Sequence, residues 1–416
     1  MEEIIRTADE IRRALWHYGF AYGNPPRLWR VSPKWYYLWE QQWQQALALG
    51  QLLPKLRAAV DSSDEATYLR ADFTLDRRGY LVLLELNGTP VWDLATQLVR
   101  ETYYRSVGLP EGSFDPFPGA AKTIAGLLLK KFSGRRLVIL LSPDRLGYGA
   151  EYRLLARYLQ SFGLCCEVSE TGESLLEGDV VYRTFTLAWL QPQSAKVFPG
   201  GQRLGELLSG GKLDIWPPFT RLEDNSWMVA VHNPETASGR SFALSSSDRQ
   251  SLKGFIPWTF PVVPEVKIPF KGRGYSWGAE EFMGRRLDNS GKETLQWVLK
   301  RCNGGQGKGI AFSSQLTAIE WRNRLLGALF PVANGDGPLY VIQPEVPTLE
   351  HKVVFLNEAG EGLVEADGYR VRLCVVYLVE GDSVEVADID ATLLDRPLVH
   401  GSSDAVAMPV IVRKKK

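Results

Sequence analysis

The sequence is poor in the residues that build zinc sites and disulfide frameworks. It contains four cysteines, Cys165, Cys166, Cys302 and Cys374, and four histidines among 416 residues, with no Cys-x-x-Cys pair. Zinc sites and disulfide-linked domains need such residues at short, regular spacings. The cysteine content gives no zinc signature and is typical of a reducing compartment, which predicts a cytoplasmic location.

Long hydrophobic runs and an excess of charge of either sign are also missing. Apolar runs such as residues 137–141 and 374–378 have the length of a strand and are too short to cross a membrane. Residues 1–14 mix charged and apolar residues, as an amphipathic helix does, and lack the apolar core of a signal peptide. Forty-eight basic residues balance forty-eight acidic ones, so no overall field attracts nucleic acid or an anionic membrane. We therefore expect neither as a partner, and any anion site must be local.

The remaining composition is that of a folded protein with more than one core. Hydrophobic residues make up 45% of the chain and charged residues 23%, a balance found in globular and not in disordered chains. A length of 416 residues predicts two or three packed subdomains. The amino-acid composition does not predict an oligomeric state.

An aromatic-rich stretch near the N-terminus has helical spacing. Ser32 and Pro33 form a cap and first-turn pair, which predicts a helix over residues 33–48. Its apolar positions are Trp35, Leu38, Trp39, Trp43, Ala46 and Leu47. Such a stripe can serve as a stacking platform, but apolar residues at this period usually face a core, so core packing is expected.

The middle of the chain has the pattern of a parallel sheet. Strands are expected over residues 137–141, 165–168 and 179–183, with a helix over 151–162 between the first two. Two strands joined through such a helix pair in parallel, so these segments predict a β-α-β unit.

A short Ser/Gly-containing stretch at residues 209–212 is the expected boundary before the last large domain. The predicted organisation therefore has three parts. Residues 1–132 contain N-terminal helices and a hairpin, 133–212 the β-α-β subdomain, and 213–416 the last large domain.

The sharpest local pattern is Arg70-x-Asp72 on one strand-like segment and Glu85-x-Asn87 on the next. Residues two apart on a strand share a face, so each pair points one way. The turn over residues 76–79 makes the two segments a hairpin.

The expected register of this hairpin brings the four side chains together. With Leu75 opposite Tyr80, Arg70 lies opposite Glu85, and Asp72 lies diagonal to Glu85 on the same face. Two carboxylates and an amide oxygen suit Mg²⁺, and the arginine suits a phosphate. The alternative is a structural salt bridge between Arg70 and Glu85, although burying several charges without a ligand is costly.

A second pattern lies around a glycine-rich stretch. Lys300 ends a strand-like run and is followed by Gly304, Gly305, Gly307 and Lys308 before a second strand-like run. A Walker loop requires Ser or Thr after its lysine and then a helix, which this stretch lacks. A flap between two strands is predicted instead, with amides and lysines that can lie over nucleotide phosphates, although an ordinary hairpin has the same pattern.

A third pattern follows at residues 339–346. An apolar strand ends in a polar, proline-interrupted segment that contains Gln343 and Glu345. Proline interrupts strand pairing, which leaves backbone groups free to bind a purine edge. Gln343 and Glu345 are therefore candidates for nucleotide contacts.

Taken together, the three patterns resemble the motifs of ATP-grasp enzymes: a lysine strand with a flap, a hinge, and an acid-x-Asn magnesium strand. In most ATP-grasp enzymes the magnesium strand follows the hinge, whereas in this chain it precedes the flap. That order is similar to the circularly permuted group typified by the synthetase domain of glutathionylspermidine synthase. The resemblance is carried above all by a block of the form R-x-D-F and E-x-N-x-T-P, with Arg70, Asp72, Phe73, Glu85, Asn87, Thr89 and Pro90 in step.

The resemblance implies a fold, two cofactors and roles for the site residues. The fold is α/β (α+β), a circularly permuted ATP-grasp with a preATP-grasp-like β-α-β subdomain. The cofactors are ATP and Mg²⁺. The family roles assign Asp72, Glu85 and Asn87 to the metal, Arg70 to the acyl phosphate as the catalytic residue, and Lys300 to the ATP phosphates.

Two more segments support the resemblance, and two positions depart from it. Residues 179–183 resemble a D-V-V-Y-R strand, and residues 217–227 a P-x-x-x-x-L-x-D-N segment. Ser226 stands where the family has a lysine, and Gln306 and Lys308 stand where its flap carries an Arg-Glu pair. Lys267 is a weak candidate for the second nucleotide cation.

The function implied by the resemblance is an ATP-dependent carboxylate-amine ligase. It would phosphorylate a carboxylate, of an amino acid or peptide, and let an amine attack the acyl phosphate, as a glutathionylspermidine synthase does. Two alternatives are a nucleotide-binding module without catalysis and a kinase-like phosphoryl-transfer enzyme on the same fold. The sequence names neither the acid nor the amine.

Overall fold

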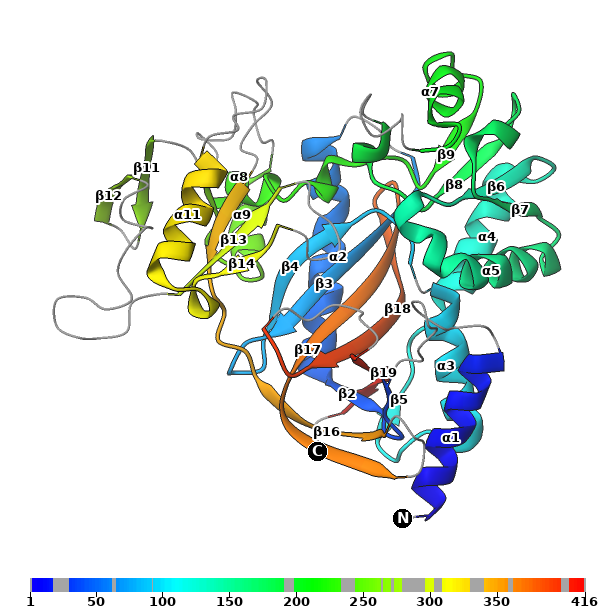
Figure 1. The fold of residues 1–416 in the computed structure, drawn as a ribbon, viewed down its shortest axis with the longest axis horizontal. Coiled ribbons are helices and arrows are strands. Elements are labelled where there is room, and N and C mark those ends of the chain that lie inside the picture. The colour runs from blue at the N-terminus through cyan, green and yellow to red at the C-terminus, as the bar shows by residue number, and fades with distance from the viewer. Residues whose placement is uncertain are drawn as a thin grey trace.

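The computed structural model describes residues 2–17, 30–61, 65–91, 93–190, 198–232, 244–262, 265–270, 273–278, 296–302, 309–329, 340–357, 362–397 and 404–414. Within these ranges the chain is a mixed α/β protein with a large central sheet. A parallel sheet lies to one side of the central sheet and a small antiparallel sheet to the other (Figure 1). No described helix is both long and apolar enough to cross a membrane.

The central sheet joins the two ends of the chain. Its main path is β1 (Arg30–Val31), β19 (Val406–Arg413), β18 (Ser383–Leu394), β17 (Leu363–Glu380), β3 (Thr67–Leu75) and β4 (Leu81–Asn87). β16 (Glu350–Leu356) pairs with β17, while β2 (Tyr36–Trp39) and β5 (Ser113–Phe114) pair with β19. The predicted hairpin is confirmed as β3 and β4, and β3 pairs antiparallel with β17, which lies far along the chain.

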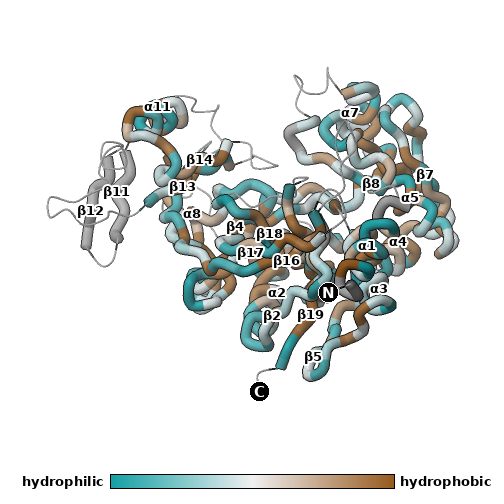
Figure 2. Tube along the Cα trace, turned by 60° about the horizontal axis from the view of Figure 1, so that its bottom comes forward, coloured by the Kyte–Doolittle hydropathy of each residue, from teal (hydrophilic) through white to brown (hydrophobic). Residues whose placement is uncertain are grey.

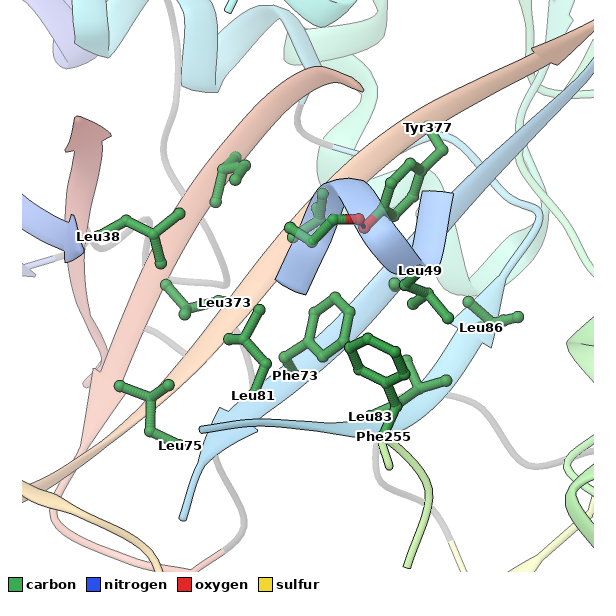
Figure 3. Packing of buried hydrophobic residues seen from close by; sticks show 14 of the residues in the cluster. Leu38, Leu49, Phe73, Leu75, Leu81, Leu83, Leu86, Phe255, Leu373 and Tyr377 are labelled. Atoms are coloured by element: carbon green, nitrogen blue, oxygen red, sulfur yellow. Dashed lines mark hydrogen bonds between the residues drawn. The ribbon is translucent and has the colours of Figure 1, made fainter. Parts of the chain in front are cut away.

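One face of this sheet packs against α2 (Glu40–Val60) and forms the largest core. Alternate residues of β3, among them Phe73, point to this face, because successive side chains of a strand point to opposite faces. Phe73, Leu373 and Tyr377 lie with Leu49 of α2 and Phe255 in this core (Figure 3). The Tyr377 hydroxyl donates to the Ala46 carbonyl oxygen at 2.8 Å, which ties the helix to the sheet. Hydrophobic residues follow the strands around β18 and β19 (Figure 2).

The predicted helix over residues 33–48 is wrong at its start. Residues 36–39 form β2, which pairs in parallel with β19, and the helix begins at Glu40. Aromatic residues favour strands, and the hydrogen bonds offered by β19 outweigh the local helical spacing. The expected core packing holds for Trp43, whereas Trp39 is 46% exposed.

The predicted β-α-β unit is confirmed. β6 (Arg136–Leu140), α5 (Gly149–Ser161) and β7 (Cys165–Ser169) follow one another, and β7 pairs in parallel with β6. The full sheet has the order β7, β6, β8 (Val180–Arg183) and β9 (Asp214–Trp216). β9 belongs to this sheet although it follows residues 209–212, the expected domain boundary. The division of the chain into three domains stays a prediction.

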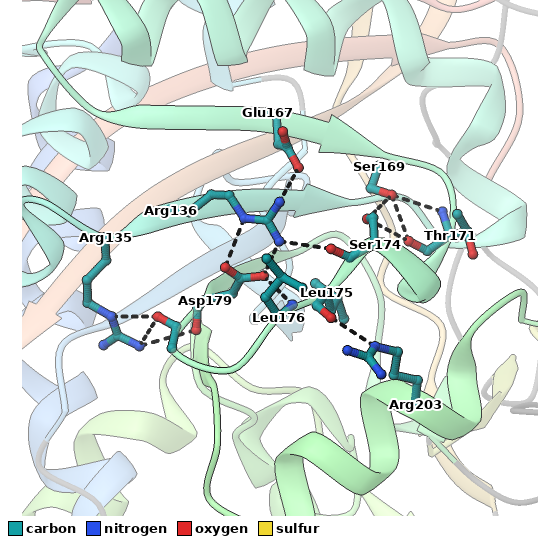
Figure 4. A network of polar contacts seen from close by, with 11 residues as sticks. Arg135, Arg136, Glu167, Ser169, Thr171, Ser174, Leu175, Leu176, Asp179 and Arg203 are labelled. Carbon is teal, nitrogen blue, oxygen red and sulfur yellow. Dashed lines mark hydrogen bonds and ion pairs between the residues drawn. The ribbon is translucent and has the colours of Figure 1, made fainter.

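Polar contacts fasten the edge of the parallel sheet. Arg136 at the start of β6 binds Glu167 of β7 and Asp179 beside β8, so it connects three neighbouring segments (Figure 4). A second core lies between this sheet, α5, α4 (Ala120–Phe132) and part of the central sheet. Tyr68, Val376 and Leu378 contribute to that core from the face opposite α2.

The small sheet carries the other sequence patterns. Its order is β10 (Phe260–Pro261), β15 (Tyr340–Pro344), β13 (Trp297–Arg301) and β14 (Ala311–Phe312). The remaining elements are α1 (Glu2–His17), α3 (Asp93–Ser106), α7 (Gly201–Ser209), α8 (Trp227–His232), α9 (Ser246–Lys253), α11 (Ala318–Leu329) and the ribbon of β11 (Glu265–Phe270) and β12 (Arg273–Gly278). Short 3-10 turns occur at Pro143–Tyr148, Gly172–Ser174, Leu187–Leu190, Arg221–Glu223 and Ser313–Gln315. Trp321 and Leu325 of α11 pack on this sheet.

Candidate active site

The predicted hairpin residues lie on the face of the central sheet opposite α2. The expected register is wrong, because Arg70 lies opposite Asn87 and Asp72 lies opposite Glu85. The ladder begins at Leu75 opposite Leu81, and an irregularity between Asp72 and Phe73 shifts the register once more. The two shifts add up to two residues, which keeps all four side chains on one face.

Asp72 is the centre of the charged contacts at this site. Arg70 Nε lies 2.9 Å from Asp72 Oδ1, and Arg70 Nη2 lies 3.3 Å from Oδ2. Arg372 of β17 reaches the same carboxylate, with 3.7 Å between Nη1 and Oδ2. Burial alone would raise the pKa of Asp72, but the two arginines outweigh burial and lower it. The salt bridge considered from the sequence, Arg70 with Glu85, is replaced by this Arg70–Asp72 pair.

Glu85 experiences the opposite environment. Asn87 Nδ2 donates to Glu85 Oε1 at 3.0 Å, and Glu85 also shares a side-chain hydrogen bond with Asp72. Burial raises the pKa of Glu85, and the negative charge of Asp72 opposite raises it further. Neighbouring carboxylates whose pKa values are pushed apart need a proton or a cation between them.

The residues present fit a magnesium ion. Asp72, Glu85 and Asn87 offer two carboxylates and one amide oxygen, and Mg²⁺ takes one or two carboxylates with water and phosphate oxygens completing its shell. Among the described residues no group of three or more His, Cys, Asp and Glu side chains is placed to hold a metal. The candidate set is therefore two acids and the Asn87 amide. Because both Asp72 oxygens accept from Arg70, a bound metal has to share that carboxylate with the arginine.

Lys300 comes to the site from the small sheet. It is buried in β13, and its Nζ donates to the Leu84 carbonyl oxygen at 3.2 Å. Leu84 has no partner in the β3–β4 ladder, so the irregularity in the hairpin frees the carbonyl that Lys300 binds. Burial lowers the pKa of Lys300 to about 8, against the attraction of Glu85. The amine is thus mostly charged at neutral pH and lies within the influence of Glu85.

The nucleotide contacts predicted along the small sheet are described in part. β13 pairs antiparallel with β14 and β15, but Gly304, Gly305, Gly307 and Lys308 lie outside the described residues, so the flap stays a prediction. Gln343 is buried, and its amide binds Thr259 Oγ1 at 2.8 Å.

Glu345 follows β15 beside this amide. Its backbone N–H donates to the Gln296 carbonyl oxygen at 2.7 Å, and its Oε2 is buried without a hydrogen-bond partner among the described residues. Lys267, the weak candidate for a second nucleotide cation, lies in β11.

The loop after β4 is fixed by Arg183 at the end of β8. This arginine is fully buried, forms an ion pair with Glu223, and donates to Thr89 Oγ1 at 3.3 Å. It therefore connects the three segments that resemble one family. Gly88 packs against this ion pair and leaves no room for a side chain, because a Cβ on it would lie 2.4 Å from Glu223 Oε1.

Three residues of this face were missed by sequence reasoning. Cys374 lies opposite Asp72, Asp390 lies opposite Cys374, and Arg372 is two residues from Cys374 on the same strand. The signal was available as Arg370-x-Arg372 and Asp388-x-Asp390, which repeat the two-residue spacing of the hairpin motifs. Which strands pair with β3 could not be read from that spacing.

No family model and no curated protein matches this sequence. Among solved structures, the chain is similar to a glutathione synthetase-like effector from Globodera pallida, determined in its apo form, at 12% sequence identity. The match covers 98% of this chain and 96% of the other, with a TM-score of 0.58. At this identity the likeness shows the fold alone, and it supports an ATP-grasp-like fold.

The asymmetry between the two carboxylates can be measured by replacing each with its amide. Asp72→Asn strands Arg70 and Arg372 and is expected to lower the free energy of unfolding by about 3–5 kcal/mol. Glu85→Gln relieves repulsion and is expected to leave that free energy unchanged or to raise it. Chemical denaturation at neutral pH in EDTA compares the two variants with the wild type.

The pH dependence gives the sign independently. The pKa of Glu85 is raised in the folded state, so protonated Glu85 stabilises the fold relative to ionised Glu85. This stabilisation is fully present below pH 4.5, and it is lost as the pH rises through the folded-state pKa. The free energy of unfolding of Glu85→Gln, relative to that of the wild type, should therefore increase over that pH range. Equal losses of stability in the two variants at neutral pH would show that Glu85 has a structural ion-pair role.

Proposed function

We propose that this chain is an ATP-dependent carboxylate-amine ligase of the circularly permuted ATP-grasp kind, similar to the synthetase domain of glutathionylspermidine synthase. The observation that carries the proposal is the row of Asp72 and Glu85, flanked by Arg70 and Asn87, with Lys300 entering from a second sheet. The pairing of β3 with β17 supports a permuted order, because a hairpin from the N-terminal part of the chain lies beside strands from the C-terminal part.

The balance of charge supports a bound anion together with a metal. Among the described residues Arg70 pairs with Asp72, whereas the neighbouring Glu85 and Lys300 form no ion pair. Burying unpaired charges is costly, and such arrangements are found where a ligand completes them. A triphosphate with Mg²⁺ supplies both the missing anion and the missing cation.

Each residue has a role in the proposed reaction. Mg²⁺ on Asp72, Glu85 and Asn87 would supply neutralisation of phosphate charge during phosphoryl transfer. Arg70 is oriented by its two contacts to Asp72, which leaves Nη1 to meet the transferring phosphate. Lys300 would bind the phosphates of ATP at the β4 side of the row. The result is an acyl phosphate on the acid, ready for attack by an amine.

Ser226 favours the second candidate, a nucleotide-binding module without catalysis. In the family a lysine stands at this position, and Ser226 supplies no charge for a phosphate. The intact set of Arg70, Asp72, Glu85 and Asn87 supports the ligase, since a module that only binds nucleotide has no use for an arginine placed at the transferring phosphate. The two candidates differ in whether ADP is released.

The proposed activity is tested by ADP release from ATP and Mg²⁺. The assay uses a pool of the twenty amino acids and glutathione as acids, and putrescine, spermidine and spermine as amines. Wild type is expected to release ADP faster with the acid pool and a polyamine together than with either alone, and Glu85→Gln or Asn87→Ala should abolish this release and the thermal stabilisation by ATP–Mg²⁺. Asp382→Asn, in an exposed turn, is the matched control. Stabilisation by ATP–Mg²⁺ without ADP release would favour the binding module.

Lys300→Met separates nucleotide binding from folding. Because burial depresses the pKa of Lys300, its charge costs stability below about pH 8, and removing it should leave the unfolding free energy unchanged or higher. Loss of one charge-assisted contact of about 1.5–3 kcal/mol should weaken ATP binding roughly 10- to 150-fold. Titration calorimetry with ATP compares this variant with Lys352→Met, an exposed lysine of β16. Equal affinities in both variants would remove Lys300 from the site.

A further inference from the structure

The candidate site continues beyond the hairpin onto β17 and β18. Cross-strand partners share a face, so Glu85, Asp72, Cys374 and Asp390 form one row across β4, β3, β17 and β18. Arg372 lies two residues from Cys374 on the same face, diagonal to both Asp72 and Asp390. A guanidinium and a carboxylate therefore lie next to the predicted metal ligands, on strands that the sequence patterns did not include.

Neither of these two charged groups is fully satisfied in the described part of the chain. Arg372 reaches only Asp72, at 3.7 Å, and its buried Nε has no hydrogen-bond partner there. Asp390 makes no hydrogen bond and no ion pair within the described residues, with Arg372 or with any other group. Burial raises the pKa of Asp390 to about 6, even though Arg372 and Arg70 act against the rise.

Asp388, two residues earlier on β18, provides an internal comparison. It forms a buried ion pair with Arg100 and accepts a hydrogen bond from the Ala120 backbone N–H at 3.3 Å. The fold thus neutralises one acid of this strand with an arginine of its own. Asp390 is half-buried and lacks such a partner, as expected of a group that binds a ligand.

The row also has a direction. Lys300 contacts Leu84 on β4, so the proposed phosphate side lies at the Glu85 end of the row. Asp390 lies at the other end, across β3 and β17. The Cys374 thiol lies between Asp390 and Asp72. This thiol is neutral, because burial raises its pKa. The β18 end is therefore the part of the row farthest from the proposed phosphate side.

We propose that Arg372 binds the carboxylate that becomes activated and that Asp390 binds the attacking aliphatic primary amine and takes its proton. This inference rests on the proposed function and adds a recognition group for each of its two substrates. In amide formation a carboxylate and an amine must meet, and Arg372 and Asp390 place an anion-binding and a cation-binding group diagonally on one face.

The proposed step balances in atoms and charge. The alkylammonium gives one proton to the Asp390 carboxylate, and the free amine attacks the acyl-phosphate carbonyl carbon. The new C–N bond forms as the C–O bond to phosphate breaks, and phosphate leaves with the bonding pair and the second proton of the amine. Asp390 then returns its proton to solvent.

Hydroxylamine separates the two roles, because it is a neutral nucleophile near neutral pH and needs no base. The assay measures ADP release with ATP, Mg²⁺ and the pool of twenty amino acids and glutathione, using either hydroxylamine or the polyamine mixture as nucleophile. Asp390→Asn is expected to lower polyamine-dependent release at least about 100-fold, the scale of a lost general base, while hydroxylamine-dependent release stays within about threefold. Arg372→Met should lose both, and both variants should keep thermal stabilisation by ATP–Mg²⁺. Glu385→Gln, an exposed acid on β18, is the matched control and should change neither.

The other outcomes overturn the assignment. Polyamine-dependent release that survives in Asp390→Asn removes its role with the amine, and equal loss with both nucleophiles makes it a group for activation or folding. Retained activity in Arg372→Met removes that arginine from the carboxylate. If wild type releases no ADP with either nucleophile, the proposed function fails together with this inference, whereas a failure confined to the variants leaves the ligase proposal standing.

Discussion

The candidate site depends on one carboxylate, that of Asp72, which is held by arginines from two different strands. Arg70 binds it from β3 itself and Arg372 from β17, and Glu85 lies opposite on β4. Because Asp72 is almost completely buried, its charge must be compensated within the fold, and the two arginines supply that compensation. Glu85 is left as the second, uncompensated carboxylate, and that imbalance creates the demand for a cation at this point of the sheet.

The same arrangement explains why strands so far apart in sequence lie together. The hairpin β3–β4 supplies only half of the polar face, and β17 and β18 supply the other half on the opposite side of Asp72. The α2 side of these strands is lined by apolar residues apart from Thr67, so the alternation of each strand places the charges of the candidate site on the other face. Function and core packing therefore use the same four strands without competing for positions.

Local patterns predicted those parts of the fold that depend on local physics. The two-residue spacing of Arg70 and Asp72 identified the face correctly, and the β-α-β unit followed from its run of apolar strand, helix and strand. The register failed because the turn and the irregularity beside Leu84 each added one residue, which no spacing rule reveals. The aromatic spacing that predicted a helix at residue 33 was outweighed by pairing with β19, a contact with the other end of the chain. Arg372 and Asp390 were missed for the same reason, since only long-range pairing brings them beside Asp72.

The most direct test of this account is the position of a divalent metal. Crystals grown with Mn²⁺ and a non-hydrolysable ATP analogue would locate the metal through its anomalous scattering. The account predicts a peak about 2.0–2.3 Å from oxygens of Asp72, Glu85 and Asn87, with the terminal phosphate between that metal and Arg70. A nucleotide bound with its metal elsewhere, and with the Arg70–Asp72 and Glu85–Asn87 pairs undisturbed, would contradict it.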